Sequence, residues 1–421
     1  MIRELLNRYS HINWALADQA MVSGVNFLTG LLLARFLGIS EFGVFTLLWM
    51  AVLFVNSIQL ALIVSPMMSI GPKQPEREKG TYYSALVIQQ AVFAVVTFFT
   101  LYLGAHLAGI FNPQWSVSHL ALPLAFAGTS FQCQDFIRRY FFCHNNPVAA
   151  FWNDAISYLG QIAILMTLFF TSGLDVNLVL WVIAITSMLA IMIGMFKVAV
   201  YKVSLGDVIL AMKRNWVISK WLTGSAILQW TSGNLFVLAA GALLGVTAVG
   251  ALKAAQNIIG VTHILFQSLE NIVPVKASVL FSRLGVEGLV KYLKQVAFLG
   301  GGVISIICIL VGVFAEDLMG LIYGSTYEAY GYTLQWYAVI YLLIFICLPL
   351  RSGLRSFETT RPIFVAYVLM TVFSISFAAL MVESWALSGA LIGILIGQLI
   401  MVLSLCIALW KNVHRVRGVR V

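Results

Sequence analysis

The chain has 421 residues, of which 61% are hydrophobic and only 10% are charged, and its mean hydropathy is +0.95. Soluble domains are about half apolar and about a quarter charged, so this composition excludes a soluble globular protein and predicts an integral membrane protein. The net charge of +9 would by itself suit a nucleic-acid partner, but the distribution of the charges along the chain excludes that class.

Hydrophobic segments of about 20 residues recur from one end of the chain to the other, and this is the length that an α-helix needs to cross a bilayer. The alternating pattern of a membrane β-barrel does not occur. The first segment contains Asp18 and is too long and too polar for a cleaved signal peptide. The predicted fold class is therefore all-α, a polytopic membrane protein with 12 transmembrane helices at about 13–37, 42–69, 81–108, 117–142, 149–171, 176–200, 220–244, 248–275, 291–315, 330–351, 361–382 and 387–410.

The basic residues predict the orientation of these spans. If the N-terminus is cytoplasmic, 23 of the 25 lysines and arginines lie in or beside cytoplasmic segments, and only Arg35 and Lys253 lie elsewhere. Such alternation is the positive-inside rule. It predicts a multi-pass protein with both termini in the cytoplasm, which contacts anionic membrane lipids and binds no nucleic acid.

The connection between the sixth and seventh spans carries lysines at 197, 202, 213 and 220 that alternate with apolar residues. This pattern predicts an amphipathic helix on the cytoplasmic surface. The predicted domains are therefore an N-terminal lobe with spans 1–6 (1–200), a cytoplasmic linker helix (201–219) and a C-terminal lobe with spans 7–12 (220–421).

An internal repeat supports this division into two lobes of six helices. At an offset of 207 residues, Gly38 aligns with Gly245, and at an offset of 215 residues, Pro147 aligns with Pro362. Because each half has an even number of spans, the two copies share one orientation. A substrate is then expected in a central cavity between them, near the membrane midplane.

The eighth predicted span has a polar face. Wound as an α-helix, residues 250–274 place Lys253, Gln256, Asn257, His263, Gln267 and Glu270 within one arc about 140° wide. A polar face of this length is not expected to face lipid. It predicts either the lining of an aqueous cavity or hydrogen bonds to neighbouring helices.

Two stretches resemble a known family. ADQAMVSGVNFLTGLLLARFLGISEFGVFTLL, residues 17–48, resembles the first two spans of bacterial oligosaccharide flippases, the O-antigen and exopolysaccharide (Wzx-type) members of the multidrug/oligosaccharidyl-lipid/polysaccharide exporter superfamily. RRYFFCHNNP, residues 138–147, resembles the basic connection between their fourth and fifth spans. Drug-exporting members of the superfamily also have twelve spans, whereas lipid II flippases have two more. The resemblance therefore leaves open an ion-coupled drug or organic-cation antiporter.

The resemblance implies two six-helix lobes around a cavity lined mainly by spans 1, 2, 7 and 8. It also implies translocation of an isoprenoid-diphosphate-linked oligosaccharide across the bacterial inner membrane by alternating access, for polysaccharide or O-antigen biosynthesis. The expected partners are this lipid-linked glycan and the polysaccharide polymerase machinery.

Polar residues of the four cavity spans are the candidates for substrate contact. Lys253 could neutralise a diphosphate, and amide side chains suit sugar hydroxyls because each both donates and accepts hydrogen bonds. The alternative for Lys253 and Arg35 is that the side chain extends to the membrane interface. The full set of candidates is Lys253, Arg35, Asn26, Asn56, Gln59, Gln229, Gln256, Asn257, His263 and Gln267.

Three acids within spans, Asp18, Asp154 and Glu270, are the candidates for coupling transport to a proton or sodium gradient. A carboxyl group inside a membrane helix is expected to bind a cation or to pair with a base. Pairing with Arg138 or Arg139 is the favoured interpretation for Asp154, whereas for Asp18 and Glu270 both interpretations remain open.

The sequence predicts neither an enzyme nor a metal or cofactor site. It contains no GxxxxGK[ST], HExxH or CxxC pattern, and its five cysteines suggest no disulfide. The predicted outer loops are short, which also argues against a membrane glycan polymerase or ligase, the third function considered.

Overall fold

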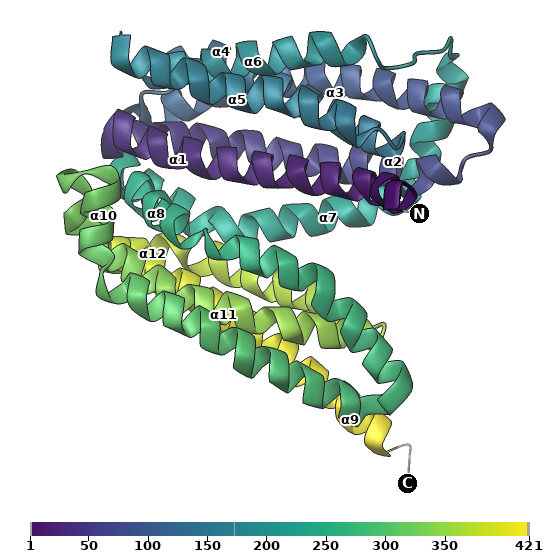
Figure 1. Cartoon of the computed structure of the whole chain (residues 1–421). Helices are drawn as coiled ribbons and strands as arrows, with labels where there is room; N and C mark the ends of the chain where they lie inside the picture. Colours follow the sequence, from purple (N-terminus) through teal and green to yellow (C-terminus); the bar gives the residue numbers. More distant parts are fainter. Residues whose placement is uncertain (1, 172, 419–421) are drawn as a thin grey trace. The chain divides into compact units, whose positions relative to one another are not determined.

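The computed structural model describes residues 2–171 and 173–418, and these residues form helices joined by connections without a β-strand (Figure 1). The predicted all-α fold class is therefore confirmed. The chain divides into two compact units, unit 1 from Met1 to Ile227 and unit 2 from Leu228 to Val421.

Unit 1 is arranged around one central helix, α4 (Ala121–Cys143), which contacts helices on several sides. Its contacts are α1 (Ile2–Gln59), α3 (Glu76–Phe111), α5 (Pro147–Thr171) and α6 (Val176–Met195). The unit also contains a π-helix (Leu60–Val64), α2 (Ser65–Ile70), 3-10 turns at Gly71–Lys73, Pro113–Trp115 and Ser118–Leu120, and the first part of α7 (Leu205–Leu244). The boundaries follow local chemistry: Pro147 opens α5, and Asp175 caps α6 by accepting a hydrogen bond from the backbone N–H of Leu178 at 2.7 Å.

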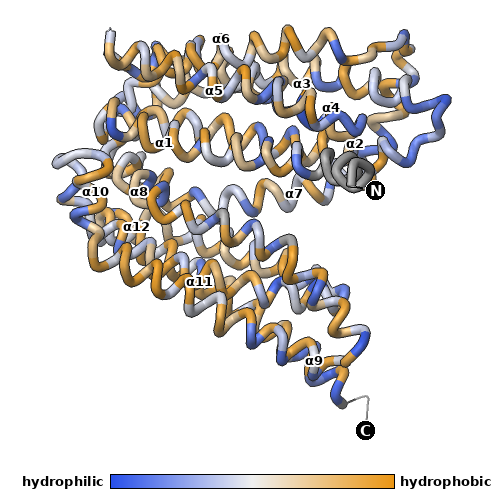
Figure 2. The backbone as a smooth tube through the Cα atoms, in the orientation of Figure 1, coloured by the Kyte–Doolittle hydropathy of each residue, from blue (hydrophilic) through white to orange (hydrophobic). Residues whose placement is uncertain are grey.

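Unit 2 also has a central helix, α11 (Gly331–Ser356). It contacts α8 (Val246–Ile259), α9 (Thr262–Val313), α10 (Ala315–Tyr323), the 3-10 segment Ser325–Tyr330 and α12 (Arg361–Gly418). Most of the length of these helices is hydrophobic (Figure 2), as burial in a bilayer requires.

Eight helical stretches among the described residues are long and apolar enough to cross a membrane. Three of them contain a backbone break between two predicted spans: at Gly38 in α1, at Gly285 in α9 and at Ala386 in α12. The central helix α4, which carries three charged side chains near its C-terminal end, is not among the eight. The membrane-spanning helical fold is therefore confirmed, whereas the count of exactly twelve spans stays a prediction.

Backbone geometry supports the internal repeat. Gly38 has φ 75° and ψ 169°, and its repeat partner Gly245 has φ 89° and ψ 175°, so both glycines break the chain in the same conformation. Each connection after a central helix also has a residue with positive φ two positions beyond the helix end, Asn145 (φ 53°) after α4 and Glu358 (φ 56°) after α11. The two halves therefore share backbone conformations at the paired glycines and after their central helices.

The helices differ from the predicted elements at two places. Residues 201–219 were predicted as a cytoplasmic linker helix, and in the structure residues 205–219 form the start of α7, which continues to Leu244. The division into two lobes and a linker stays a prediction. The eighth span was predicted as one helix over 248–275, but α8 ends at Ile259 and α9 begins at Thr262. The interruption falls at residues 260–261, and Gly260 itself keeps right-handed helical torsions (φ −59°, ψ −18°).

Candidate functional site

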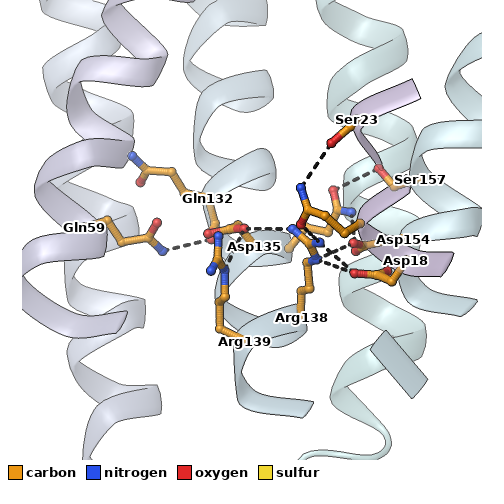
Figure 3. Close-up of polar contacts among 11 residues, drawn as sticks. Asp18, Ser23, Gln59, Gln132, Asp135, Arg138, Arg139, Asp154 and Ser157 are labelled. Atoms are coloured by element: carbon orange, nitrogen blue, oxygen red, sulfur yellow. Dashed lines mark hydrogen bonds and ion pairs between the residues drawn. The ribbon is translucent and has the colours of Figure 1, made fainter. Parts of the chain in front are cut away.

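The most concentrated group of buried charges lies inside unit 1 (Figure 3). The central helix α4 carries Asp135, Arg138 and Arg139 at spacings of three and four residues, which places them on neighbouring positions of the helix surface. Asp18 comes from α1 and Asp154 from α5, and both acids are fully buried. We call these five residues the acid cluster.

Arg138 holds the acid cluster together. Its Nη2 and Nε atoms donate to Oδ2 of Asp18 at 2.6 and 3.0 Å, and its Nε atom also lies 2.7 Å from Oδ2 of Asp154. Arg138 itself is buried, so one guanidinium serves two fully buried carboxylates from two other helices. The ion pairs therefore connect α1, α4 and α5.

Neutral groups complete the surroundings of these acids. Gln134 donates to Oδ1 of Asp154 at 3.1 Å, and the hydroxyls of Ser157 and Ser187 donate to Gln134 at 2.9 and 3.1 Å. Gln19 accepts from Nη2 of Arg138 at 3.2 Å. Such a chain of buried polar contacts fixes the rotamers of the charged residues.

The charges of the acid cluster do not balance. Asp135 lies 3.4 Å from Nε of Arg139 and 3.9 Å from Nη1 of Arg138, so the three carboxylates share two guanidinium groups. Oδ1 of Asp18 and Oδ2 of Asp135 are buried and have no hydrogen-bond partner among the described residues. An uncompensated buried negative charge is costly, and a bound proton or small cation would neutralise it. Among the residues that the structure describes, no group of three or more His, Cys, Asp or Glu side chains is arranged to hold a metal ion.

The predicted pairing of Asp154 with Arg138 is confirmed by these distances. In the structure, Asp18 pairs with the same guanidinium group of Arg138. Glu270 pairs with Arg351, whose Nη2 atom donates to Oε1 of Glu270 at 2.9 Å. Sequence reasoning missed Gln134. Its position one residue before Asp135, in a helix that also carries two arginines, is a signal that could have identified it.

The side chain of Gln59 contacts neighbouring helices in this structure, and its predicted contact with substrate stays a prediction. It was predicted to contact substrate, but its side chain is fully buried, and Nε2 donates to Oε1 of Gln90 and to the backbone oxygen of Gln132, both at 2.9 Å. These bonds join α1 to α3 and α4, so in this structure Gln59 connects helices inside unit 1. Thr97 extends the chain of contacts by donating to Gln132 at 2.9 Å.

The other candidates of unit 1 are more accessible. Asn56 is partly buried, and its Oδ1 atom has no hydrogen-bond partner among the residues described. Asn26 is exposed and forms a hydrogen bond with Tyr158 of α5, and Arg35 is exposed. Their predicted contact with substrate stays a prediction.

In unit 2, much of the polar face of residues 250–274 is engaged by tyrosines. His263 Nε2 lies 3.0 Å from the hydroxyl of Tyr341, which also forms a hydrogen bond with Gln256. Asn257 forms a hydrogen bond with Tyr323, whose hydroxyl donates to the backbone oxygen of Ala254 at 3.1 Å. These contacts agree with the alternative interpretation, in which part of the polar face holds neighbouring helices together.

The remaining residues of the polar face have fewer contacts. Lys253 Nζ donates to Oδ1 of Asn234 on α7 at 3.4 Å, and no ion pair within the described ranges includes this lysine. The side chain of Glu270 is 47% exposed even though it is paired with Arg351. Gln229 and Gln267 are exposed. The polar face thus combines interhelical contacts with groups that remain available to a ligand.

Comparison with known proteins identifies the fold. Residues 222–380 match the MatE family model, and no curated protein matches the chain. An inward-facing multidrug resistance MATE family transporter of the MOP superfamily aligns with 14% identity and a TM-score of 0.71, over 96% of this chain and 95% of that one. The lipid II flippase MurJ in an inward closed conformation aligns with 15% identity and a TM-score of 0.71, over 94% of this chain and 87% of that one.

A third similar structure bears on the binding pocket. It is a MOP superfamily transporter from Pyrococcus furiosus, for which a reversed polarity of the binding pocket suggests a different function, and it aligns with 12% identity and a TM-score of 0.63 over 98% of this chain and 95% of that one. Together with the MatE match over residues 222–380, these likenesses show that the chain has the fold of the MATE and flippase transporters of the MOP superfamily.

Proposed function

We propose that the protein is a flippase that translocates an isoprenoid-diphosphate-linked oligosaccharide across the bacterial inner membrane by alternating access, for polysaccharide or O-antigen biosynthesis. No covalent bond of the substrate changes in this process. The fold supports a transporter, since it is shared with MATE transporters and with the lipid II flippase MurJ. The resemblance of residues 17–48 and 138–147 to oligosaccharide flippases supports the choice of a lipid-linked glycan.

The observation that carries the proposal is the environment of Lys253. A charged side chain within a membrane helix is expected to pair with an opposite charge or to face water. The polar contact of Lys253 is the neutral side chain of Asn234, and its helix bears no acid within one turn. An anionic diphosphate would supply the missing negative charge, and the amides and the imidazole farther along the polar face would contact the sugars.

The acid cluster of unit 1 is the proposed coupling site. A proton or a sodium ion entering it would neutralise the excess negative charge of Asp18, Asp135 and Asp154 beside Arg138 and Arg139. Binding and release of that cation would bias the packing of α1, α4 and α5, which the cluster connects. Glu270 is a weaker candidate because it is half exposed and already paired.

The test is translocation in proteoliposomes that contain a fluorescent isoprenoid-diphosphate-linked oligosaccharide. Lys253→Gln should lower the initial rate by about tenfold or more, since a hydrogen bond to a charged group contributes about 1.5–3 kcal/mol. Lys291→Gln, an exposed lysine of α9, is the matched control and should leave the rate unchanged. Unchanged translocation by folded Lys253→Gln protein would exclude the role of this lysine. Analysis of the transported glycan should show an unchanged length, because a flippase changes no covalent bond.

A cation antiporter of the same fold is the second candidate, and the two fully buried acids of the cluster are the observation that favours it. In that case Asp18→Asn should abolish efflux of an organic cation from vesicles, whereas Lys253→Gln should not reduce it. If the protein is a flippase, Lys253→Gln should instead lower the rate of translocation of the lipid-linked glycan. Deleting the protein from its host and identifying the lipid-linked intermediate that accumulates in the cytoplasmic leaflet would then name the glycan.

A further inference from the structure

Unit 1 has a groove of about 370 Å³ away from the acid cluster. Its walls come from the π-helix that follows α1, from the middle of α3 and from the first part of α7, and they are almost entirely apolar. Residues that define it include Leu62, Val92, Phe93, Val96, Met212 and Trp216. Val92, Val96, Met212 and Trp216 are each more than half exposed, so the groove opens at the surface of the helices.

Specific hydrogen bonds hold the walls in place. The backbone oxygen of Leu62 lies in the π-helix and accepts from the hydroxyl of Ser219 at 3.1 Å. Gln89 on α3 donates to the backbone oxygen of Val208 on α7 at 3.2 Å. A π-helical turn displaces backbone groups from the regular pattern and often marks a functional site. The groove is thus a built feature of the packing between the π-helix, α3 and α7.

One polar side chain in the groove lacks a partner. Asn215 is only 2% exposed and lines the groove, and its Oδ1 atom accepts from the hydroxyl of Tyr82 at 2.9 Å. Its Nδ2 atom is buried and has no hydrogen-bond partner among the described residues. A buried amide that donates no hydrogen bond costs free energy, and a ligand oxygen would satisfy it.

Two lysines lie on α7 beside the groove, and the ammonium of Lys220 lies over the ring of Trp221, 5.7 Å from its centroid. Lys213 and Lys220 are exposed, and at about 100° per residue both lie on the same side of α7, next to the face that lines the groove. They are about 10 Å apart along the helix at 1.5 Å per residue. The groove therefore combines an apolar floor, an unpaired donor and a positively charged rim.

We propose that this groove binds an anionic glycerophospholipid of the surrounding membrane. One acyl chain lies in the groove, Asn215 Nδ2 donates to an ester or phosphate oxygen, and Lys213 and Lys220 contact the negatively charged headgroup. The lining residues of α7, from Val208 to Ser219, extend over about 17 Å, roughly half of the hydrocarbon thickness of a bilayer. This length fits a single acyl chain of one leaflet better than the long chain of a polyprenyl carrier.

The first test uses phosphatidylglycerol with a photoactivatable acyl chain, in nanodiscs that contain the full-length protein. Crosslinks are expected on Val92, Val96 and Met212, and Val96→Trp should reduce labelling at Met212 by about tenfold because the indole fills the groove. Val95→Trp is the matched control, since Val95 precedes Val96 on the same helix, is 58% exposed and does not line the groove. Equal labelling of the two variants would overturn the proposal.

The second test separates the sources of the lipid chain. Photoactivatable phosphatidylcholine should label the groove more weakly than phosphatidylglycerol, and a photoactivatable polyprenyl phosphate should not compete. The Lys213→Gln/Lys220→Gln variant should bind phosphatidylglycerol about 30-fold more weakly, because each lysine near an anionic headgroup contributes several-fold to affinity. Lys291→Gln/Lys294→Gln, which removes two exposed lysines of α9, should bind as the unmodified protein does.

Preference of the groove for phosphatidylcholine, or displacement of phosphatidylglycerol by the polyprenyl phosphate, would overturn the choice of ligand. Loss of lipid binding in the α9 control variant, equal to the loss in the Lys213→Gln/Lys220→Gln variant, would show that the lysines of the groove have no special role. None of these measurements depends on translocation, so they remain informative if the proposed transport function fails.

Discussion

The two units repeat one backbone plan but place their polar groups differently. At the offsets that align the repeat, Asp18 corresponds to Ser225, Arg138 to Gly353 and Asp154 to Leu369. The second copy of the repeat therefore has no counterpart of the three residues that form the buried ion pairs of the first copy. In the other direction, Lys253 corresponds to Thr46, which is buried.

This difference separates two kinds of polar chemistry. In unit 1, charges are sequestered between helices and are only partly satisfied by one another, and this excess negative charge is the basis of the proposed coupling site. In unit 2, Lys253, Gln267 and Glu270 lie at partly exposed or exposed positions, where a larger ligand can reach them. A common fold thus carries a proposed coupling site in one half and a proposed substrate contact in the other.

The largest expected effect comes from removing the central cation of unit 1. Arg138→Gln leaves two fully buried carboxylates without a counter-charge and should lower the free energy of unfolding by about 3–5 kcal/mol. Thermal unfolding of the purified protein in detergent micelles measures this loss.

The matched change in unit 2 is Arg351→Gln, which breaks the pair with the half-exposed Glu270. It should cost no more than about 1 kcal/mol, because solvent screens exposed ion pairs. Combining Arg138→Gln with Asp18→Asn should recover part of the lost stability, since the excess negative charge decreases. Similar losses for Arg138→Gln and Arg351→Gln would contradict the contrast between a buried and an exposed pair.

The second-largest expected effect tests the backbone conformation that Gly38 and Gly245 share. Gly38 and Gly245 adopt a backbone conformation that is almost restricted to glycine, and an added Cβ at either position meets no atom within 4 Å. The cost of Gly38→Ala or Gly245→Ala is therefore backbone strain alone, about 1–3 kcal/mol, and it should be similar in the two units.

Gly24 is the control for this pair, because a Cβ there also meets nothing within 4 Å but the residue lies in a helix. Gly24→Ala should stabilise the protein by up to about 1 kcal/mol, since alanine favours helix. A loss of stability at Gly24 equal to that at Gly38 would falsify the assignment of the cost to backbone strain.

Features set by local sequence could be predicted, and features set by packing could not. Hydrophobic length predicted the helical membrane fold, and the aligned glycines predicted an internal repeat, since both are patterns along the chain itself. The pairing of Asp154 with Arg138 was favoured because both residues were predicted to lie near the cytoplasmic ends of their spans. The shared pairing of Asp18 with the same guanidinium depends on how α1 packs against α4, more than 100 residues away, so the sequence left it open.

The polar face of unit 2 could also be predicted only in part from the sequence. Its helical periodicity was visible in the sequence, but the tyrosines that contact Gln256, Asn257 and His263 come from α10 and α11. Gln59 was assigned to substrate contact because it lies in a predicted cavity span, and only the position of Gln90 on α3 identifies it as a contact between helices.

Gln59 provides the smallest of the expected effects. Gln59→Leu keeps the size of a side chain that is fully buried but removes its donors to Gln90 and Gln132, and it should destabilise unit 1 by about 1 kcal/mol, as interhelical hydrogen bonds in membranes do. Gln267→Leu, at an exposed position of unit 2, should change stability by less than about 0.5 kcal/mol. A double-mutant cycle with Gln90→Leu isolates the Gln59–Gln90 bond, and a coupling energy of zero would mean that the two amides pack together without supporting each other.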